Sequence, residues 1–155
     1  ATAAVGDNPV TASHGVRVEA DTSMAAAADD PGVEMIALPG GPGTGNLGES
    51  AEVRALAERL YRDGKWVTAI CAAPSVLSGF GLLEGRRATS FPAVRDKMEA
   101  AGVDYQEDVV VRDGPFLTSR GPGTAMDFAL ALVEALEGRP ARDEVESRLM
   151  RPGQF

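Results

Sequence analysis

Residues 65–74 read KWVTAICAAP, and this stretch decides the fold. Its first part, residues 65–70, is apolar and rich in β-branched side chains, which is typical of a buried strand. Pro74 suits the first turn of a helix, because its missing N–H would have no partner there in any case. The sequence therefore predicts that Cys71 lies at a turn between a strand and a helix.

Cys71 is the only cysteine among the 155 residues. At such a turn its sulfur would lie near unpaired backbone N–H groups and the positive end of a helix dipole, which together favour the thiolate. The alternative is a structural cysteine, since free cysteines are among the most buried residues. Residue type alone favours that alternative, so other parts of the sequence have to decide.

Two further strand-like runs end in glycine-rich loops. Residues 33–38 are followed by PGGPG at 39–43, and residues 116–119 are followed by RGPG at 120–123. Strands that each open into a loop and then a helix are typical of a parallel sheet, whose carboxyl edge binds ligands. Glycine in such loops lets the backbone approach a ligand closely. We therefore expect an α/β fold with Cys71 at a ligand-binding edge.

These segments together resemble the ThiJ/PfpI superfamily, specifically the branch of the parkinsonism-associated deglycase and its bacterial chaperone-like relatives. The resemblance runs from about residue 2 to residue 138. It is carried by LPGG at 38–41, AICAAP at 69–74, SFP at 90–92 and TSRGPGT at 118–124. It implies a flavodoxin-like three-layer sandwich with a mostly parallel sheet and the cysteine at a nucleophile elbow.

The resemblance also implies an activity. It is a cysteine-dependent, glutathione-independent glyoxalase or deglycase activity on methylglyoxal, related α-oxoaldehydes or their early glycation adducts. Cys71 would be the nucleophile, and the backbone N–H groups of Gly41 and Ala72 would stabilise the oxyanion. The alternative is a redox-sensing or chaperone-like stress protein that acts through oxidation of Cys71. Further residues implied for the pocket or an interface are His14, Gly40, Phe91 and Arg120.

The beginning of the chain departs from the family pattern. In the family, a first strand and helix precede the segments seen here, and the turn between them carries a glutamate that hydrogen-bonds the cysteine. This chain starts with residues that resemble the second strand. We therefore expect residues 1–155 to form a single domain that is incomplete at its N-terminus, without the acid partner of Cys71. Asp7, Glu19 and Asp21 do not stand in the matching context.

His14 is the only histidine, and it stands where close relatives usually carry an arginine near a dimer interface. A catalytic Cys–His pair is one hypothesis, but the protease-like branch has its histidine where Ala72 stands here. Phe91 likewise occupies a place where some relatives have a histidine. We interpret His14 as a pocket or interface residue. We expect a homodimer that buries the surroundings of His14 and the loop after Gly41.

Composition narrows the classes of partner. The formal net charge of −8 argues against a nucleic-acid groove and against binding to anionic membranes. No apolar run approaches the roughly 20 residues of a membrane span. One cysteine excludes an internal disulfide, so we expect a cytoplasmic protein. We expect a small aldehyde or glycated substrate, no cofactor, and no metal, since no residue cluster has metal-ligand spacing. An amidotransferase-like hydrolase would need a histidine after the cysteine, which is absent.

Four local signals predict the surrounding elements. Ser50 is predicted to cap a helix that carries an apolar stripe and ends at Gly64. Asp113-Gly114 between two apolar runs predicts a hairpin. Residues 125–136 are apolar nearly all round, which predicts a helix buried by the sheet or by another subunit. Residues 124–127 are predicted to begin that helix with a variant of the capping box.

Overall fold

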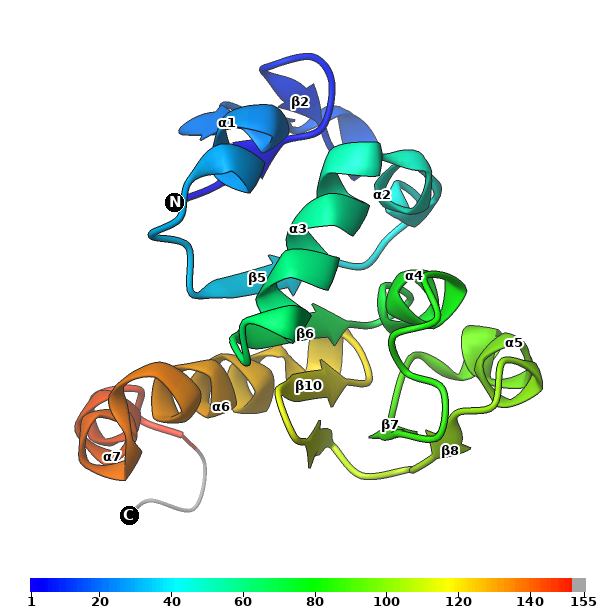
Figure 1. The fold of residues 1–155 in the computed structure, drawn as a ribbon. Helices are drawn as coiled ribbons and strands as arrows, with labels where there is room; N and C mark the ends of the chain where they lie inside the picture. Colours follow the sequence, from blue (N-terminus) through cyan, green and yellow to red (C-terminus); the bar gives the residue numbers. More distant parts are fainter. Residues whose placement is uncertain (152–155) are drawn as a thin grey trace.

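A four-stranded sheet forms the centre of the protein, in a computed structural model that describes residues 1–151. The strand order is β5-β6-β10-β9, and β5, β6 and β10 run parallel while β9 runs antiparallel to β10 (Figure 1). The predicted α/β fold with mostly parallel strands is confirmed. The bounds are Met35–Leu38 for β5, Trp66–Ile70 for β6, Val110–Asp113 for β9 and Phe116–Ser119 for β10.

The register places the ends of the three parallel strands side by side. Leu38 of β5 lies opposite Ala69 of β6, and Ser119 of β10 lies opposite Ile70. The loops that follow these strands therefore meet at one carboxyl edge, as the sequence predicts. The hairpin of β9 and β10 is also confirmed, with Asp113 opposite Phe116 across the turn.

Helix α3 (Ala51–Arg62) covers one face of the sheet. It begins at the predicted cap, where the Ser50 hydroxyl oxygen accepts a hydrogen bond of 3.2 Å from the Val53 N–H. Its apolar stripe packs against β5 and β6, because alternate strand residues point to one face. Members of this core cluster include Val53, Leu56, Ala57 and Leu60 of the helix and Ile36, Leu38, Val67 and Ala69 of the strands.

Helix α6 (Ala125–Glu137) packs against β6, β9 and β10. Phe128 and Leu130 are buried, but Met126 and Leu136 remain 47% and 45% exposed within the described chain. Intrachain packing thus buries only part of this helix. The capping box predicted at 124–127 is wrong: Thr124 is the N-cap, but its hydroxyl binds Gly121 and caps no N–H of α6. Helix α7 (Arg139–Ser147) packs against α6.

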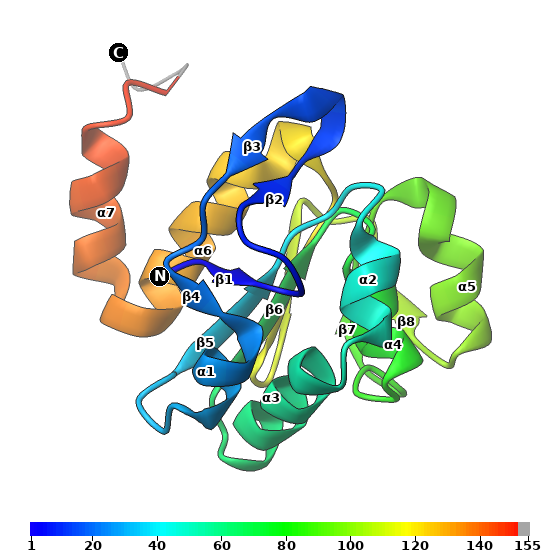
Figure 2. The same ribbon diagram turned by 90° about the horizontal axis from the view of Figure 1, so that it is seen from above.

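Three short helices surround the carboxyl edge, together with a small pair of strands. Figure 2 shows α2, α4 and α5 next to one another on the side of the sheet that carries the loop ends. None of the described helices has the length and apolar character needed to cross a membrane. The bounds are Thr44–Glu49 for α2, Pro74–Gly79 for α4, Arg95–Ala100 for α5, Arg87–Ala88 for β7 and Asp104–Tyr105 for its parallel partner β8.

The first 29 residues form a group of small elements that packs against α3, and Met24 belongs to the main hydrophobic core. Strands β1 (Ala3–Ala4) and β4 (Thr22–Ser23) pair in parallel, but they share no ladder with β5, which is therefore an edge strand within the described chain. The predicted upstream strand and helix stay a prediction. The other elements here are β2 (Val10–Thr11), β3 (Arg17–Val18), and α1 (Met24–Asp29), which follows the N-cap Ser23.

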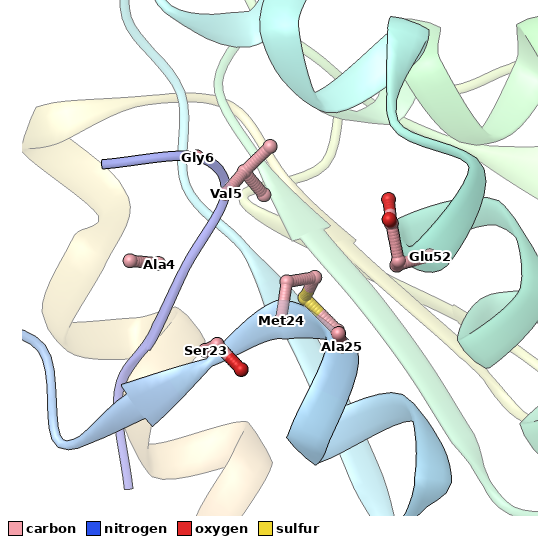
Figure 3. A pocket seen from close by; sticks show the side chains of 7 residues that line it. All are labelled: Ala4, Val5, Gly6, Ser23, Met24, Ala25 and Glu52. Atoms are coloured by element: carbon pink, nitrogen blue, oxygen red, sulfur yellow. The ribbon is translucent and has the colours of Figure 1, made fainter. Parts of the chain in front are cut away.

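A hollow of about 190 Å³ lies between these N-terminal elements and the beginning of α3. Val5 and Met24 line it from one side and Glu52 from the other (Figure 3). The carboxylate of Glu52 accepts a hydrogen bond from the Ser50 hydroxyl, which lowers its pKa. Cys71 does not line this hollow, so it is not the predicted site.

Candidate active site

Cys71 follows β6 directly and adopts a backbone conformation that is rare for residues other than glycine. Its φ is 66°, in the left-handed region, where a side chain is strained. Its N–H donates to the Ser119 carbonyl at 3.0 Å, and its carbonyl accepts from the Phe91 N–H at 2.8 Å. Helix α4 begins three residues later. The strand-to-helix turn predicted for Cys71 is therefore present, and backbone hydrogen bonds on both sides hold it.

Gly40, two residues after the end of β5, lies against the side chain of Cys71. A Cβ atom built on Gly40 would stand 2.4 Å from the Cys71 Cβ and 2.9 Å from its Sγ, closer than real side chains approach. Only glycine fits at this position without a shift of the elbow. The glycine-rich loop and the cysteine turn thus form one site, as their shared sheet edge predicts.

The two predicted oxyanion donors are the backbone N–H groups of Gly41 and Ala72. The carbonyl groups of the same two residues accept hydrogen bonds that hold their loops in place. The Gly41 carbonyl accepts from the N–H and the hydroxyl of Thr44, at 3.2 and 3.0 Å. The Ala72 carbonyl accepts from the N–H and the hydroxyl of Ser75, at 3.1 and 2.8 Å. Neither the Gly41 N–H nor the Ala72 N–H donates a hydrogen bond within residues 1–151. Both N–H groups are therefore available to a ligand.

The loops from β7 and β10 complete the surroundings of the elbow. Besides its backbone bond to Cys71, Phe91 places its ring next to Gly121, where an added Cβ would lie 3.5 Å from the ring, and 44% of Phe91 is exposed. Arg120 is directed toward Glu107, since its Nη1 donates to the Glu107 carbonyl at 2.9 Å. The structure thus brings Gly40 and Phe91 to the Cys71 turn and joins Arg120 to a neighbouring loop.

A hydroxyl pair beneath this loop was not predicted from the sequence. The Ser119 hydroxyl donates to the Val109 carbonyl at 2.7 Å and lies 2.7 Å from the Thr124 hydroxyl oxygen. The Thr124 oxygen in turn accepts from the Gly121 N–H at 3.0 Å. These bonds fix the loop that follows β10. The sequence predicts Thr124 at the helix cap, whereas a threonine hydroxyl can equally bond to the backbone of a neighbouring loop, as it does here.

His14 lies elsewhere, in the turn between β2 and β3. It is exposed, its φ is 63°, and its side chain makes no hydrogen bond or ion pair with a described residue. The structure therefore does not join His14 to Cys71 within the described chain.

Among residues 1–151, no carboxylate forms a hydrogen bond with the Cys71 sulfur and no cluster of metal ligands surrounds it. No hydrogen bond links a described residue to the Cys71 Sγ, which belongs to a half-buried free cysteine. Within the same residues, no group of three His, Cys, Asp or Glu side chains has a geometry that could hold a metal ion. The chemistry available to the described site is that of a thiol, backbone donors and the surrounding loops.

The comparison with known proteins identifies the family of this chain. The model of the DJ-1/PfpI family matches residues 1–135. The chain belongs to the DJ-1/PfpI family. Within it, the chain is 40% identical to the protein dj-1beta of Drosophila melanogaster over 147 residues, which cover 94% of this chain and 78% of that protein. The crystal structure of Drosophila DJ-1beta superposes with a TM-score of 0.85 at 39% identity, covering 90% of this chain and 75% of that one.

Two other DJ-1 relatives bear on length and activity. The chain is 39% identical to protein DJ-1 homolog A of Arabidopsis thaliana, a match that covers 92% of this chain and 37% of the plant protein. It is 36% identical to a Caenorhabditis elegans protein named glutathione-independent glyoxalase DJR-1.2, over 93% of this chain and 74% of that protein. The branch expected from the sequence is confirmed.

Proposed function

We propose that the protein is a cysteine-dependent, glutathione-independent glyoxalase or deglycase that acts on methylglyoxal and related α-oxoaldehydes or their early glycation adducts. The observation that carries this proposal is the strained turn at Cys71, which lies so close to Gly40 that a Cβ added there would stand 2.9 Å from the sulfur. Strained conformations persist where the surrounding structure enforces them, and they cluster at functional sites. The name of the glyoxalase relative in C. elegans supports the same chemistry.

The reaction needs no external oxidant. The Cys71 thiolate adds to the aldehyde carbon of methylglyoxal and forms a hemithioacetal, whose oxygen carries the negative charge. A base moves the proton of that carbon to the neighbouring carbonyl carbon, so that the first carbon is oxidised while the second is reduced. Water then cleaves the resulting thioester, which releases lactate and restores the thiol.

Two groups assist in this scheme. The free N–H groups of Gly41 and Ala72 stabilise the oxyanion, and loss of one such donor typically costs about 10²–10³ in rate. A carboxylate transfers the proton, as the family pattern implies. No described carboxylate hydrogen-bonds the sulfur, and Asp7, Glu19 and Asp21 are not proposed for this role.

The test is consumption of methylglyoxal with formation of lactate by the wild-type protein and by Cys71→Ser. The exchange of sulfur for oxygen is nearly isosteric, so the variant should fold and retain its melting temperature. We expect the wild type to form one lactate for each methylglyoxal and the variant to form none above the buffer rate. Equal turnover by both proteins would leave a structural cysteine as the better account.

The alternative function is redox sensing or a chaperone-like stress response through oxidation of Cys71. It is supported by the single free cysteine, which is half-buried and accepts no hydrogen bond from a described residue. A thiol of this kind can pass to sulfenate and sulfinate. Oxidation by peroxide without measurable turnover of methylglyoxal, in the same preparation, would favour this function over the first.

We also propose a cytoplasmic homodimer. Three apolar side chains of the N-terminal hairpin, Val10, Val16 and Val18, are exposed beside His14. A second copy would remove such a patch from water. Sedimentation should give a dimer at micromolar concentration, and a monomer there would contradict the proposal.

A further inference from the structure

A groove of about 460 Å³ lies between α2, α4 and α5, with the beginning of α3 at its side. Its volume is within the range of small-molecule sites, roughly 300–1,000 Å³. Cys71 does not line it, and neither does any residue proposed above for the reaction. The groove is therefore separate from the cysteine site, although α2 and α4 are the helices that follow Gly41 and Cys71 (Figure 2).

The charges that line the groove are both positive. Arg54 of α3 and Lys97 of α5 belong to the lining, and no acidic side chain does. In a chain with a formal net charge of −8, such a pair is unexpected for a surface hollow. The Lys97 ammonium group forms no hydrogen bond or ion pair within residues 1–151. Two segments distant in the sequence thus supply cations to one groove.

Arg54 is held in position while part of its guanidinium stays available. Its Nε donates to the Glu58 carboxylate at 2.8 Å, and its Cζ lies 5.3 Å from the centre of the Phe80 ring. Neither Nη atom makes a hydrogen bond within the described chain. A guanidinium that is fixed in this way presents N–H donors to a carboxylate at a small entropic cost.

The rest of the lining is apolar or already satisfied. Phe80, Val76 and Val94 give the groove an apolar wall. The hydroxyl groups of Thr44 and Ser75, which also line it, donate to the carbonyls of Gly41 and Ala72. These two hydroxyl groups therefore have no proton left to donate to a ligand. A ligand would be bound by Arg54, Lys97 and the apolar wall.

We propose that this groove binds a small organic carboxylate that carries an aromatic or branched apolar group. The carboxylate lies between Arg54 and Lys97, and the apolar group lies against Phe80 and the two valines. Binding in the groove requires no step of the reaction at Cys71, so the test of this proposal is independent of the test of the glyoxalase function.

The experiment is a titration of the full chain with sodium benzoate, followed by amide NMR. We expect the amides of Gly45, Gly48 and Gly79 to shift together with one dissociation constant in the millimolar range, about 4 kcal/mol of binding free energy. Benzyl alcohol, which lacks the charge, and acetate, which lacks the ring, should each bind more weakly. Titration of Cys71→Ser should give the same constant as the wild type.

Charge variants test the two cations. Arg54→Gln and Lys97→Gln should each weaken benzoate binding about two- to fivefold, the range of an exposed ion pair, and the double variant should weaken it about tenfold. Arg62→Gln removes an exposed cation of the same helix outside the groove and should leave the constant unchanged. Unchanged binding in the double variant, or benzoate shifts spread over the whole surface, would overturn the proposal.

Discussion

The carboxyl edge of the four-stranded sheet and the N-terminal hairpin are built in opposite ways. At the edge, Cys71 is strained at φ 66° and is held by backbone hydrogen bonds from β10 and the loop at Phe91. In the hairpin, His14 has a similar φ of 63°, but it is exposed and its side chain makes no hydrogen bond with a described residue. A positive φ alone is therefore a weak sign of function. The difference is that hydrogen bonds from neighbouring elements hold the positive φ of Cys71, whereas the His14 side chain has no such partner among the described residues.

The largest effect is expected from Gly40→Ala, which tests how neighbouring elements hold Cys71 at the edge. The new methyl group would stand 2.4 Å from the Cys71 Cβ, so the elbow must shift. We expect turnover of methylglyoxal to fall about 100-fold or more, the typical result of an ångström-scale misplacement. We also expect overpacking to lower the free energy of unfolding by about 1–3 kcal/mol.

Gly43→Ala is the matched control in the same loop. A Cβ there meets no atom within 4 Å, and φ is −75°, which alanine adopts readily. Activity and stability should stay close to those of the wild type. An equal loss in both variants would show that the loss does not arise from the contact between Gly40 and Cys71.

Ser119→Ala should have the next largest effect, on stability. It removes the hydrogen bond to the Val109 carbonyl and the bond with the Thr124 hydroxyl, which keeps only its bonds to Gly121, at a cost of about 1–3 kcal/mol. Ser78→Ala is the control, because the buried Ser78 hydroxyl has no hydrogen-bond partner among the described residues. Urea unfolding should show a clear loss for the first variant and almost none for the second. The reverse order would contradict the assigned hydrogen bonds.

A smaller effect is expected from Asp113→Asn, on the opposite end of the same sheet. The backbone N–H of Arg87, and after it the Arg86 guanidinium, hold the pKa of Asp113 below its ordinary value of 3.8. The contribution of Asp113 to stability is therefore present above pH 3.8 and is lost as the pH falls through the lower pKa of the folded state. At pH 6 the free energy of unfolding of the variant should be about 1 kcal/mol lower than that of the wild type.

The same comparison near pH 2–3 completes this test. There the difference between Asp113→Asn and the wild type should shrink, because Asp113 is protonated as the pH falls through its lowered pKa, while the amide of the variant carries no charge at any pH. A difference that stays constant with pH would show that the carboxylate charge contributes nothing through Arg86 and Arg87.

His14→Ala should have the smallest effect, because the side chain is exposed in the N-terminal hairpin. We expect turnover of methylglyoxal within about twofold of the wild type, as for a surface substitution distant from the elbow. Any larger loss should follow dimer dissociation in sedimentation at the same concentration. A loss of turnover in a protein that stays dimeric would instead give His14 a role in catalysis and remove the contrast between the two regions.

The sequence predicts most reliably the features that depend on residues close together in the chain. The turn at Cys71, the Ser50 cap and the Asp113-Gly114 hairpin each join residues that are adjacent in the chain, and the structure confirms all three. Predictions failed where a residue had two local partners. Thr124 is the N-cap residue of α6, as predicted, but its hydroxyl bonds to Gly121 in the preceding loop and caps no N–H of the helix.

Contacts between distant segments were harder to predict. The contact of Gly40 with the sulfur could be expected only in outline, since the loop pattern places the two residues at one edge but gives no distance. The apolar pattern of α6 indicated a buried helix, yet Met126 and Leu136 remain exposed within the described chain. Periodicity shows which side chains are apolar, but it does not show what covers them.

The most direct test of the central claim is stepwise alkylation of the native protein with iodoacetamide. Cys71 is the only cysteine, so the mass increase reports the fraction of Cys71 modified without any change of sequence. Lactate formation from methylglyoxal should fall in proportion to that fraction and reach the buffer rate when every chain carries one acetamide group. A fully alkylated protein that still forms lactate at the wild-type rate would contradict the account of Cys71 as the nucleophile.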